Sequence, residues 1–544
     1  MKTFDAIIVG AGFAGMYMLH RLRGLGLSAR VLEAGDGVGG TWYWNRYPGA
    51  RCDVQSMDYS FSFSEELQQE WEWSEKYATQ PELLRYANHV ADRFDLRRDI
   101  QFATRVAHAA YDATSARWHI ETASGETFAA RVFIMATGCL SVPKAIDIPG
   151  ADSFAGATYH TADWPRDGVD FSGQRVAVIG TGSSAIQSIP IIAGQAADLT
   201  VFQRTPAFSL PAFNRPLDPE EVRSWKAHYA EHREKSRYSL FGVPDFPMDK
   251  SAHDVAPAER AATYEAGWSG GTLIALLQSY NDLLTDEAAN ETAAEFVRDK
   301  IRAIVNDPEV AETLCPKSFP IGAKRLCLDT NYYATYNEPH VHLVDVRKTP
   351  IESITPKGIR TSDGEREFDA IVFATGFDAM TGAVVNVDIR GRDGIGLKDK
   401  WEAGPRTYLG LTVAGFPNLF LITGPGSPSV MSNMIISIEQ HVEWISDCLS
   451  WMRERGHAVI EAESAAEDGW VAHVNEVADA TLLPKANSWY MGANVPGKPR
   501  VFMPYIGGCG PYRQQCEKVV AEDYSGFRFE DESEDAQAQP ASAG

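Results

Sequence analysis

The sequence predicts an α/β protein with two Rossmann-like domains and a helical insertion in the second domain. Two glycine-rich loops, at residues 10–15 and 180–185, each separate an apolar strand from a helical pattern. Two Ala-Thr-Gly segments, 136–138 and 374–376, each follow a further apolar strand. A chain of 544 residues exceeds the size at which one hydrophobic core stops growing, so we expect several domains.

The first glycine-rich loop contains Gly10, Gly12 and Gly15, with Phe13 between them. Gly10 permits a tight turn, Gly12 lets a pyrophosphate approach the backbone, and Gly15 lets the next helix pack on the strand. The next strand, expected at residues 29–33, ends in Glu33. This carboxylate can accept a hydrogen bond from a ribose hydroxyl, so the segment predicts a dinucleotide site.

The second loop reads Gly180-Thr181-Gly182-Ser183-Ser184-Ala185, with alanine in place of the third glycine. The following strand leads to Arg204 and Thr205 where an acid would suit NADH. An arginine at this point favours the 2′-phosphate of NADPH. The alternative is that Arg204 is a solvated surface charge.

The segment between the two loops fits the pattern F-x-G-x-x-x-H-x-x-x-W-P through Phe154, Gly156, His160 and Trp164. Together with the two loops, it resembles type I Baeyer-Villiger monooxygenases, most of all the phenylacetone and steroid monooxygenase branch, from about Met1 to Phe529. The resemblance implies FAD, NADPH whose NADP+ stays bound during oxygenation, and O2 as co-substrate. It also implies that aryl, cyclic or steroid-like ketones become esters or lactones through a C4a-peroxyflavin and a tetrahedral Criegee adduct, with sulfoxidation as a side activity.

The same resemblance divides the chain. Residues 1–140 and 379–529 are expected to form an FAD-binding domain, and residues 141–213 and 320–378 an NADPH-binding domain. Residues 214–319 are rich in Glu, Arg, Lys and Ala at helical spacing, which predicts the helical insertion. Residues 530–544 contain too few apolar side chains to pack and are expected to be a disordered acidic tail.

Arg325 is the candidate catalytic cation, because its segment resembles the active-site arginine segment of the family. A permanent cation can stabilise the oxyanions that develop during oxygen insertion. Asp53 resembles the partner carboxylate that orients this arginine. The alternatives are a structural arginine at a domain edge and an aspartate that caps a helix or turn.

Further site residues follow from the resemblance. Beyond the loop residues, Thr41, Trp42, Trp44, Asp53, Tyr59, Val106 and Met434 are assigned to FAD. Arg51, Gln187, Lys324, Arg325 and Trp489 are assigned to NADP. Cys139, Leu140, Ser429, Val430 and Met431 are assigned to the ketone pocket, where Cys139 departs from the usual residue. An aromatic residue taken singly is more often core than cofactor contact. His160 is expected to couple domain rotation to nicotinamide reduction.

Composition narrows the function classes. A net charge of -23 disfavours nucleic acid and acidic membranes as partners. Seven cysteines without a C-x-x-C pair are expected to be reduced thiols, and no metal site is predicted. No apolar run reaches the roughly 18 residues of a membrane span. We expect a cytoplasmic monomer or weak homodimer that acts on a small ketone.

Two other interpretations stay open at this point. A flavin N- or S-hydroxylating monooxygenase shares both loops and a related linker, but Trp164-Pro165 and Lys324-Arg325 favour the Baeyer-Villiger pattern. A non-catalytic flavoprotein, such as a redox sensor, would bind dinucleotides without oxygen transfer. The presence of Asp53 and Arg325 argues against it.

Overall fold

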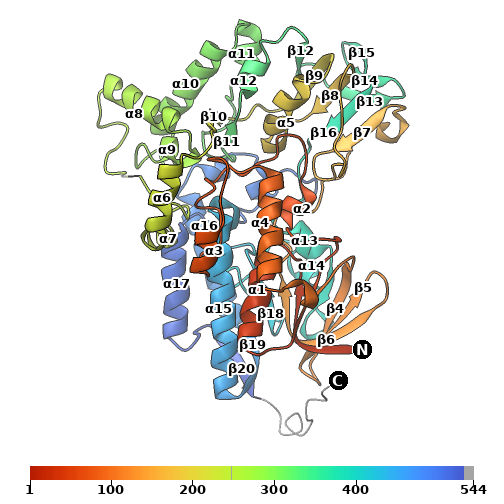
Figure 1. The fold of residues 1–544 in the computed structure, drawn as a ribbon, viewed down its shortest axis with the longest axis vertical. Helices are drawn as coiled ribbons and strands as arrows, with labels where there is room; N and C mark the ends of the chain where they lie inside the picture. The colour runs from red at the N-terminus through yellow and green to blue at the C-terminus, as the bar shows by residue number, and fades with distance from the viewer. Residues whose placement is uncertain (247, 532–544) are drawn as a thin grey trace.

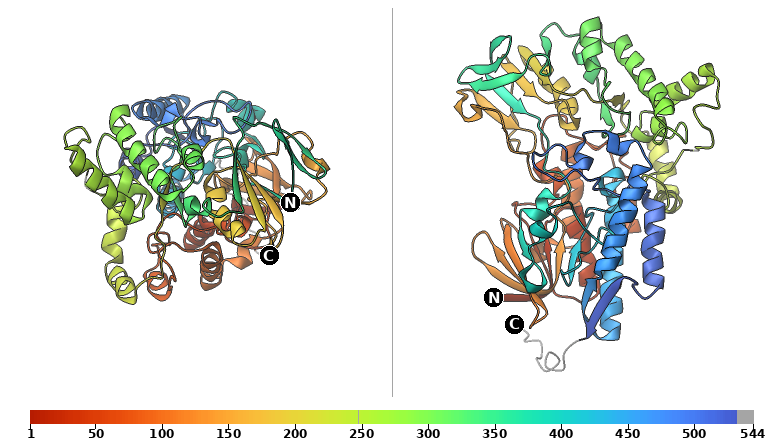
Figure 2. Two further views of the ribbon diagram at one scale, coloured as in Figure 1. Left: turned by 90° about the horizontal axis from the view of Figure 1, so that it is seen from above. Right: turned by 180° about the vertical axis from the view of Figure 1, so that it is seen from behind.

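The computed structural model describes residues 1–246 and 248–531. The molecule is elongated, with one large sheet in its lower half and a second sheet in its upper half (Figure 1). The helices from α8 (Pro257–Gly270) to α11 (Pro308–Leu314) lie at the level of the second sheet, whereas α7 (Tyr229–Arg237) lies lower, beside α17 (Cys509–Ala521) (Figure 1). The long helix α15 (Met434–Arg455) runs along the lower half (Figure 2).

The first sheet has the order β17-β4-β5-β6-β1-β2-β3, and β18 also pairs with β6. Its central strands β1 and β6 are parallel and stay in register from Lys2 opposite Phe128 to Val9 opposite Met135. The strands are β1 Lys2–Val9, β2 Ala29–Leu32, β3 Ile100–Gln101, β4 Val106–Asp112, β5 Arg117–Thr122, β6 Thr127–Met135, β17 Asp388–Arg390 and β18 Leu419–Leu421.

Two helices from distant parts of the chain pack side by side against this sheet (Figure 1). They are α1 (Phe13–Gly24) and α15 (Met434–Arg455). The side chain of Arg21 donates to Ser446 at 3.0 Å and to Asp447 at 2.8 Å, which joins the two helices. The helical layer on the first sheet therefore comes from two segments that are far apart in the sequence.

The second sheet is parallel throughout and has the order β12-β9-β8-β16-β7. Its strands are β7 Ala157–His160, β8 Arg175–Ile179, β9 Asp198–Gln203, β12 Val341–Asp345 and β16 Ala370–Phe373. Helix α5 (Ser183–Ala193) follows β8 directly. Parallel strands present their carboxyl ends at one edge, so the loops after β8, β9 and β16 meet there.

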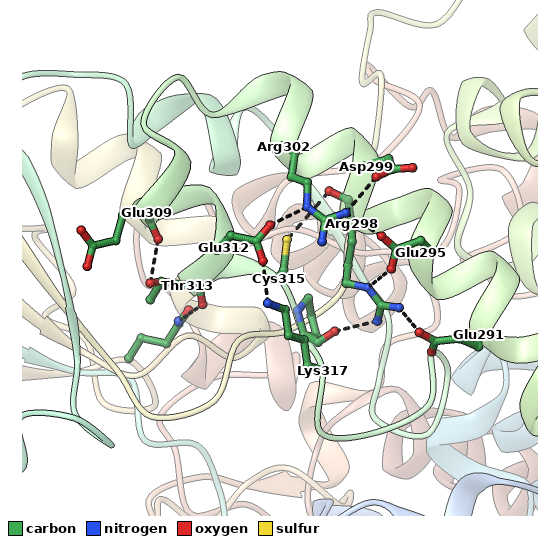
Figure 3. A network of polar contacts seen from close by, with 12 residues as sticks. Glu291, Glu295, Arg298, Asp299, Arg302, Glu309, Glu312, Thr313, Cys315 and Lys317 are labelled. Carbon is green, nitrogen blue, oxygen red and sulfur yellow. Dashed lines mark hydrogen bonds and ion pairs between the residues drawn. The ribbon is translucent and has the colours of Figure 1, made fainter.

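The described residues of the segment 214–319 are largely helical, as their composition predicts. Its helices are α6 Pro219–Ala227, α7 Tyr229–Arg237, α8 Pro257–Gly270, α9 Leu273–Leu277, α10 Glu287–Ile304 and α11 Pro308–Leu314. A network of ion pairs ties α10 to α11 and to Lys317 (Figure 3). The chain then continues into the segment that carries Lys324 and Arg325.

Smaller elements complete the described chain. The remaining helices include α2 Thr41–Trp44, α3 Glu65–Glu70, α4 Gln80–Arg93, α12 Tyr332–Thr335, α13 Gly382–Val385, α14 Leu397–Lys400, α16 Ser464–Asp479 and α17 Cys509–Ala521. The remaining strands are β10 Ser209–Pro211, β11 Cys327–Asp329, β13 Ile351–Thr355, β14 Gly358–Thr361, β15 Gly364–Glu367, β19 His457–Ala462 and β20 Phe527–Asp531. Within residues 1–246 and 248–531, no helix combines the length and the apolar character needed to cross a membrane.

One expectation about the C-terminus is wrong by two residues. Glu530 and Asp531, which were expected in the disordered tail, belong to β20 and pair with β19. Main-chain pairing needs no apolar side chain, and both carboxylates have partners: Arg392 forms an ion pair with Glu530, and Nδ1 of His457 lies 2.7 Å from Asp531. The rest of the expected tail, residues 532–544, lies outside the described residues.

Candidate active site

The first glycine loop leaves a helix N-terminus open to an anion. Gly12 is the N-cap of α1 and no side chain caps the helix, whereas Asp218 caps α6 and Asp286 caps α10. A Cβ on Gly10 would lie 2.7 Å from the carbonyl oxygen of Ala136. The loop therefore presents unpaired N–H groups in a cradle without side chains, which fits a pyrophosphate.

Glu33 fixes this loop from the end of β2. Its two carboxylate oxygens accept hydrogen bonds from the backbone N–H groups of Ala11 at 2.6 Å and Gly35 at 2.7 Å. Each oxygen keeps acceptor capacity beyond these bonds. Glu33 can therefore hold the loop and still accept from a ribose hydroxyl.

The aromatic residues predicted for the FAD site fall into two groups. Phe13 and Trp42 both contact Tyr59, with ring centroids 6.0 and 5.9 Å apart, and the indole N–H of Trp42 donates to the Tyr59 hydroxyl at 3.3 Å. Burial raises the pKa of Tyr59 well above its usual value, so this phenol stays neutral. Trp44 packs instead on Tyr43.

The other predicted FAD residues are spread over different elements. Thr41 is exposed at the start of α2. Val106 is buried at the start of β4 in an apolar cluster of the first sheet, away from the cluster around Phe13 and Tyr59. Met434 begins α15 and is partly buried against the apolar cluster of Tyr490.

The second glycine loop has the same open geometry. Gly182 is the N-cap of α5, again without a side-chain cap, and the Thr181 hydroxyl donates to the carbonyl oxygen of Thr205 at 3.0 Å. The Ser183 hydroxyl lies 3.2 Å from the Cys327 thiol, and Ser184 is half-buried next to it. This N-terminus can hold a second pyrophosphate.

Cations without acid partners gather near this loop. Burial lowers the pKa of Lys324, and Arg204 lowers it further; the same two causes lower the pKa of Lys144, which Asp147 partly offsets. Within the described part of the chain, Arg204, Lys324 and Lys144 form no ion pair with a carboxylate. Their mutual repulsion indicates a site for an anion.

Lys144 was missed by the sequence reasoning. Its backbone N–H donates to the carbonyl oxygen of Gly376 at 3.0 Å, which brings it to the carboxyl edge of the second sheet. No local motif marks it, because its proximity to Arg204 exists only after β9 and β16 have joined one sheet.

Arg51 and Gln187 connect the two halves of the molecule. The Tyr47 hydroxyl donates to the side-chain oxygen of Gln187 at 2.9 Å, and the Gln187 amide donates to the carbonyl oxygen of Arg51 at 3.1 Å. The guanidinium of Arg51 pairs with Glu75 at 2.9 Å. Arg51 thus differs from Arg204 in having its charge offset within the protein.

Arg325 and Asp53 meet although 272 positions separate them in the sequence. The Nε and Nη2 atoms of Arg325 donate to one carboxylate oxygen of Asp53, at 2.9 and 2.6 Å. Its Nη1 atom donates to the carbonyl oxygen of Val430 at 2.9 Å. Three separate segments therefore fix the guanidinium, which still has N–H donors to spare.

Charge at this centre is secure at any physiological pH. Burial acts to lower the pKa of Arg325, but the Asp53 carboxylate outweighs it and raises the pKa above its ordinary value. Burial raises the pKa of the neighbouring Tyr490 to about 12, against the effect of Arg325. The site therefore holds a permanent cation beside a neutral phenol.

The residues predicted for the ketone pocket form one apolar cluster around this pair. Cys139 and Val430 are buried in it, and Leu140 and Met431 pack against it. Ser429 is fully buried, and its hydroxyl donates to the Cys139 thiol at 3.7 Å. Burial raises the pKa of Cys139 to about 11, so the thiol is neutral.

Trp489 lies at the edge of this cluster and packs against Tyr490 with the rings tilted and their centroids 4.3 Å apart. Its indole N–H has no hydrogen-bond partner among the described residues. The donor is therefore available to a ligand.

The linker motif lies at the edge strand β7. The N–H of Ala162 donates to Nδ1 of His160 at 3.1 Å, so Nε2 carries the proton and faces the Thr375 hydroxyl at 3.2 Å. Burial lowers the pKa of His160, which keeps it neutral. Trp164 is buried against Tyr159.

Gly156 is required in this motif by its surroundings. A Cβ there would lie 2.5 Å from the carbonyl oxygen of Asp369 and 2.6 Å from the ring of Phe154. The motif therefore seats the start of β7 against β16.

The fold and the site define a flavoprotein with two glycine-rich loops of the dinucleotide-binding type and a half-buried arginine, Arg325, paired with Asp53. Residues 7–226 match the family model described as pyridine nucleotide-disulphide oxidoreductase. Acetone monooxygenase (methyl acetate-forming) from Gordonia sp. (strain TY-5) is 43% identical over 527 residues, 96% of this chain and 99% of the relative. A protein named Baeyer-Villiger monooxygenase from Pseudooceanicola batsensis is 43% identical over 96% of this chain and 95% of its own.

Among solved structures, an oxidized steroid monooxygenase bound to NADP superimposes with a TM-score of 0.94 at 52% identity. The match covers 98% of this chain and 100% of that one. The chain belongs to the Baeyer-Villiger monooxygenase family.

Proposed function

We propose that this protein uses FAD, NADPH and O2 to convert a ketone to an ester or lactone. The balance is ketone, O2, NADPH and one proton giving ester, water and NADP+. One oxygen atom enters the bond between the carbonyl carbon and a substituent, and the other leaves as water with the two electrons of NADPH. FAD, when bound, supplies the redox chemistry that links NADPH to O2.

The binding roles follow from the two open helix N-termini. We assign FAD to the loop at Gly10–Gly15 with Glu33, in a domain of residues 1–140 and 379–529. NADPH is assigned to the loop at Gly180 and Gly182, in a domain of residues 141–213 and 320–378. Arg204, Lys324 and Lys144 supply the positive charge that selects its 2′-phosphate.

The observation that carries the proposal is the Arg325–Asp53 pair. During oxygen insertion the ketone oxygen gains negative charge, and a fixed cation lowers the energy of that state. Asp53 holds the Nε–Nη2 edge of the guanidinium and the Val430 carbonyl holds Nη1, so the remaining N–H groups of Arg325 can bind the developing oxyanion. The apolar cluster around Val430 and Cys139 excludes water, which strengthens this interaction.

His160 has a separate role in the proposal. It bridges the end of β7 to Thr375, in the Ala-Thr-Gly crossover that follows β16. A neutral imidazole in this position transmits movement between the linker and the crossover rather than transferring protons. His160→Ala should slow turnover while FAD stays bound, and full activity in this variant would contradict the role.

The substrate class and setting are also proposed here. The apolar pocket around Val430 suits aryl, cyclic or steroid-like ketones, and sulfides should be oxidised as a side reaction. All seven cysteines are buried and free, which suits a reducing cytoplasm. We propose a monomer or weak homodimer, which sedimentation at several protein concentrations would test.

The function is tested by supplying the purified yellow protein with NADPH in air and a panel of linear, aryl and cyclic ketones, with a sulfide, an amine and an N-heterocycle alongside. Products are identified by mass, and Arg325→Ala is run in parallel. We expect a ketone to gain one oxygen as an ester or lactone in the wild type but not in the variant.

Three outcomes would contradict the proposal. Oxygenation of the amine or the N-heterocycle without any ketone product would indicate the N-hydroxylating class. Absence of NADPH consumption above the free-flavin background would indicate a binding module. Hydrogen peroxide equal to the NADPH consumed, whatever ketone is added, would indicate an oxidase without oxygen transfer.

A further inference from the structure

A cavity of about 180 Å³ adjoins the cluster around Arg325. Two segments of the chain line both the cavity and the cluster around Arg325. Gly426 lines the cavity, while Val430 of the same loop accepts a hydrogen bond from Arg325. Phe502 and Met503 line the cavity and also belong to the buried cluster of Cys139, Val430 and Tyr490.

Hydrogen bonds connect these shared walls. The N–H of Gly426 donates to the carbonyl oxygen of Met503 at 2.7 Å, and the N–H of Met503 donates to the carbonyl oxygen of Tyr490 at 2.9 Å. Tyr490 in turn belongs to the environment of Arg325. The backbone of Met503 thus lies between the cavity and the reaction centre.

The chemistry of the lining selects an apolar molecule. The Thr407 hydroxyl is already bonded to the carbonyl oxygen of Pro425 at 2.7 Å, and the indole N–H of Trp470 to that of Gly426 at 3.0 Å. Arg406 is paired with Asp468. These polar groups are satisfied inside the protein, and apart from the exposed Asn475 the other side chains of the wall are apolar, including Val471, Val474, Val501, Phe502 and Met503.

The volume fits a phenyl-sized group, since an apolar cavity of about 150 Å³ is enough to hold benzene. Val474 is buried on α16, and Val471 is half-buried one turn earlier on the same helix. Gly404 and Val501 lie close together in the wall of the cavity, because a Cβ on residue 404 would be 2.9 Å from the Val501 side chain.

We propose that this cavity is a waiting site for apolar ketones on their way to Arg325, with Phe502 and Met503 forming the gate between the two. The inference rests on the proposed function and deepens it. It makes the enzyme favour ketones that carry a phenyl-sized substituent, because such a group gains burial in the cavity that acetone cannot fill.

The test compares benzyl methyl ketone with acetone, which lacks the phenyl group. Val474→Trp fills the cavity without touching Arg325. We expect kcat/KM for benzyl methyl ketone to fall at least about fivefold, with kcat and the acetone kcat/KM unchanged, since burying one apolar group contributes about 1 kcal/mol or more. Ala472→Trp, on the exposed side of the same helix, is the matched control and should change neither value.

A second measurement does not depend on turnover. Crystals of the FAD-loaded enzyme under xenon should show a xenon atom between Trp470 and Val474 in the wild type and none in Val474→Trp. Should Val474→Trp fail to fold, Val471→Phe fills the same cavity from a half-buried position.

The outcomes separate the inference from the function. If xenon does not enter the wild-type cavity, or if Val474→Trp excludes xenon but keeps its kcat/KM for benzyl methyl ketone, the waiting site is wrong. If xenon enters but the wild type oxygenates no ketone of the linear, aryl and cyclic panel, the proposed function itself is wrong.

Discussion

Two arginine-centred regions of this molecule use the same side chain in opposite ways. Arg325 binds a single carboxylate, that of Asp53, and its other hydrogen bond goes to the neutral carbonyl group of Val430. Arg298, in the network of α10, is held by Glu291 and by Glu295 at 2.7 Å, and donates to the carbonyl oxygen of Pro316 at 3.0 Å (Figure 3).

The network around Arg298 also contains a second arginine, Arg302, which has carboxylate partners of its own. Arg302 binds Glu295 at 2.6 Å and Glu312 at 2.5 Å, and these contacts raise its pKa. Arg302 and Lys317 hold the pKa of Glu312 at about 2. Cations surrounded by carboxylates in this way connect helices, whereas Arg325 has one carboxylate partner and keeps N–H donors that can act on a ligand.

The largest effect is expected at Arg325. Arg325→Ala should lower the rate of ester formation about 1000-fold, the upper range for loss of an oxyanion donor. The melting temperature should hardly change, because Asp53 is partly exposed and becomes hydrated. Product formation measured by mass, beside FAD content and thermal unfolding, checks this.

Arg325→Lys is the matched variant, since it keeps the charge but cannot form the paired bonds to Asp53 and Val430. Its activity should lie between those of wild type and Arg325→Ala. If Arg325→Ala forms ester at a rate within threefold of wild type, Arg325 does not act on the ligand and its role does not differ from that of Arg298.

Arg298 should show the opposite pattern. Arg298→Met leaves the buried carbonyl of Pro316 without its donor and should lower the melting temperature by about 5 °C, while kcat per bound FAD stays within about twofold. Arg223→Met is the control, because Arg223 and Glu220 are both well exposed and such pairs contribute less than about 1 kcal/mol. A catalytic defect larger than the stability defect would assign Arg298 to the site.

Sequence reasoning finds the glycine loops because each glycine meets a local requirement. Gly10 and Gly180 both have positive φ, and a Cβ on either residue would clash with a backbone carbonyl oxygen, that of Ala136 or Ala374 respectively. Helix α15 begins at Met434 because the side chain of Asn433 accepts from the N–H of Ile435 and caps the helix there. Local patterns thus predict the fold nearly to the residue.

The reaction centre is different. Arg325 and Asp53 were named only through family resemblance, because no spacing rule relates residues so far apart. The Val430 carbonyl, Tyr490 and Lys144 were not assigned to their contacts, since a backbone acceptor or an isolated lysine carries no signal before the sheets assemble. Tertiary contacts, rather than side-chain type, define this part of the site.

Asn290 connects the two regions and sharpens the comparison. Its amide donates to the carbonyl oxygens of Leu283 and Ile321, at 2.7 and 2.9 Å, and accepts from the N–H of Ile321 at 2.9 Å. Ile321 leads directly to Lys324 and Arg325. Asn290→Ala should lower kcat about tenfold through misplacement of Arg325.

Asn337→Ala is its control, because that amide also bridges backbone groups, at Ile304 and Asn306, but lies away from residues 320–325. Measuring kcat and the melting temperature of both variants separates position from stability. Equal losses of melting temperature with an unchanged kcat in Asn290→Ala would show that the network and the reaction centre are independent.

The smallest effect is expected at Lys144, a cation of a third kind, which forms no ion pair with a carboxylate among residues 1–246 and 248–531. Lys144→Ala should raise KM for NADPH about fivefold, as expected for an interaction of about 1 kcal/mol with the 2′-phosphate, and leave KM for NADH unchanged. Arg204→Ala and Lys324→Ala should raise KM for NADPH about 50-fold, because charged hydrogen bonds contribute about 1.5–3 kcal/mol. Lys348→Ala, an exposed lysine after β12, serves as the control. An equal rise in KM for NADPH and NADH in Lys144→Ala would place Lys144 at the pyrophosphate, since only the 2′-phosphate distinguishes the two cofactors.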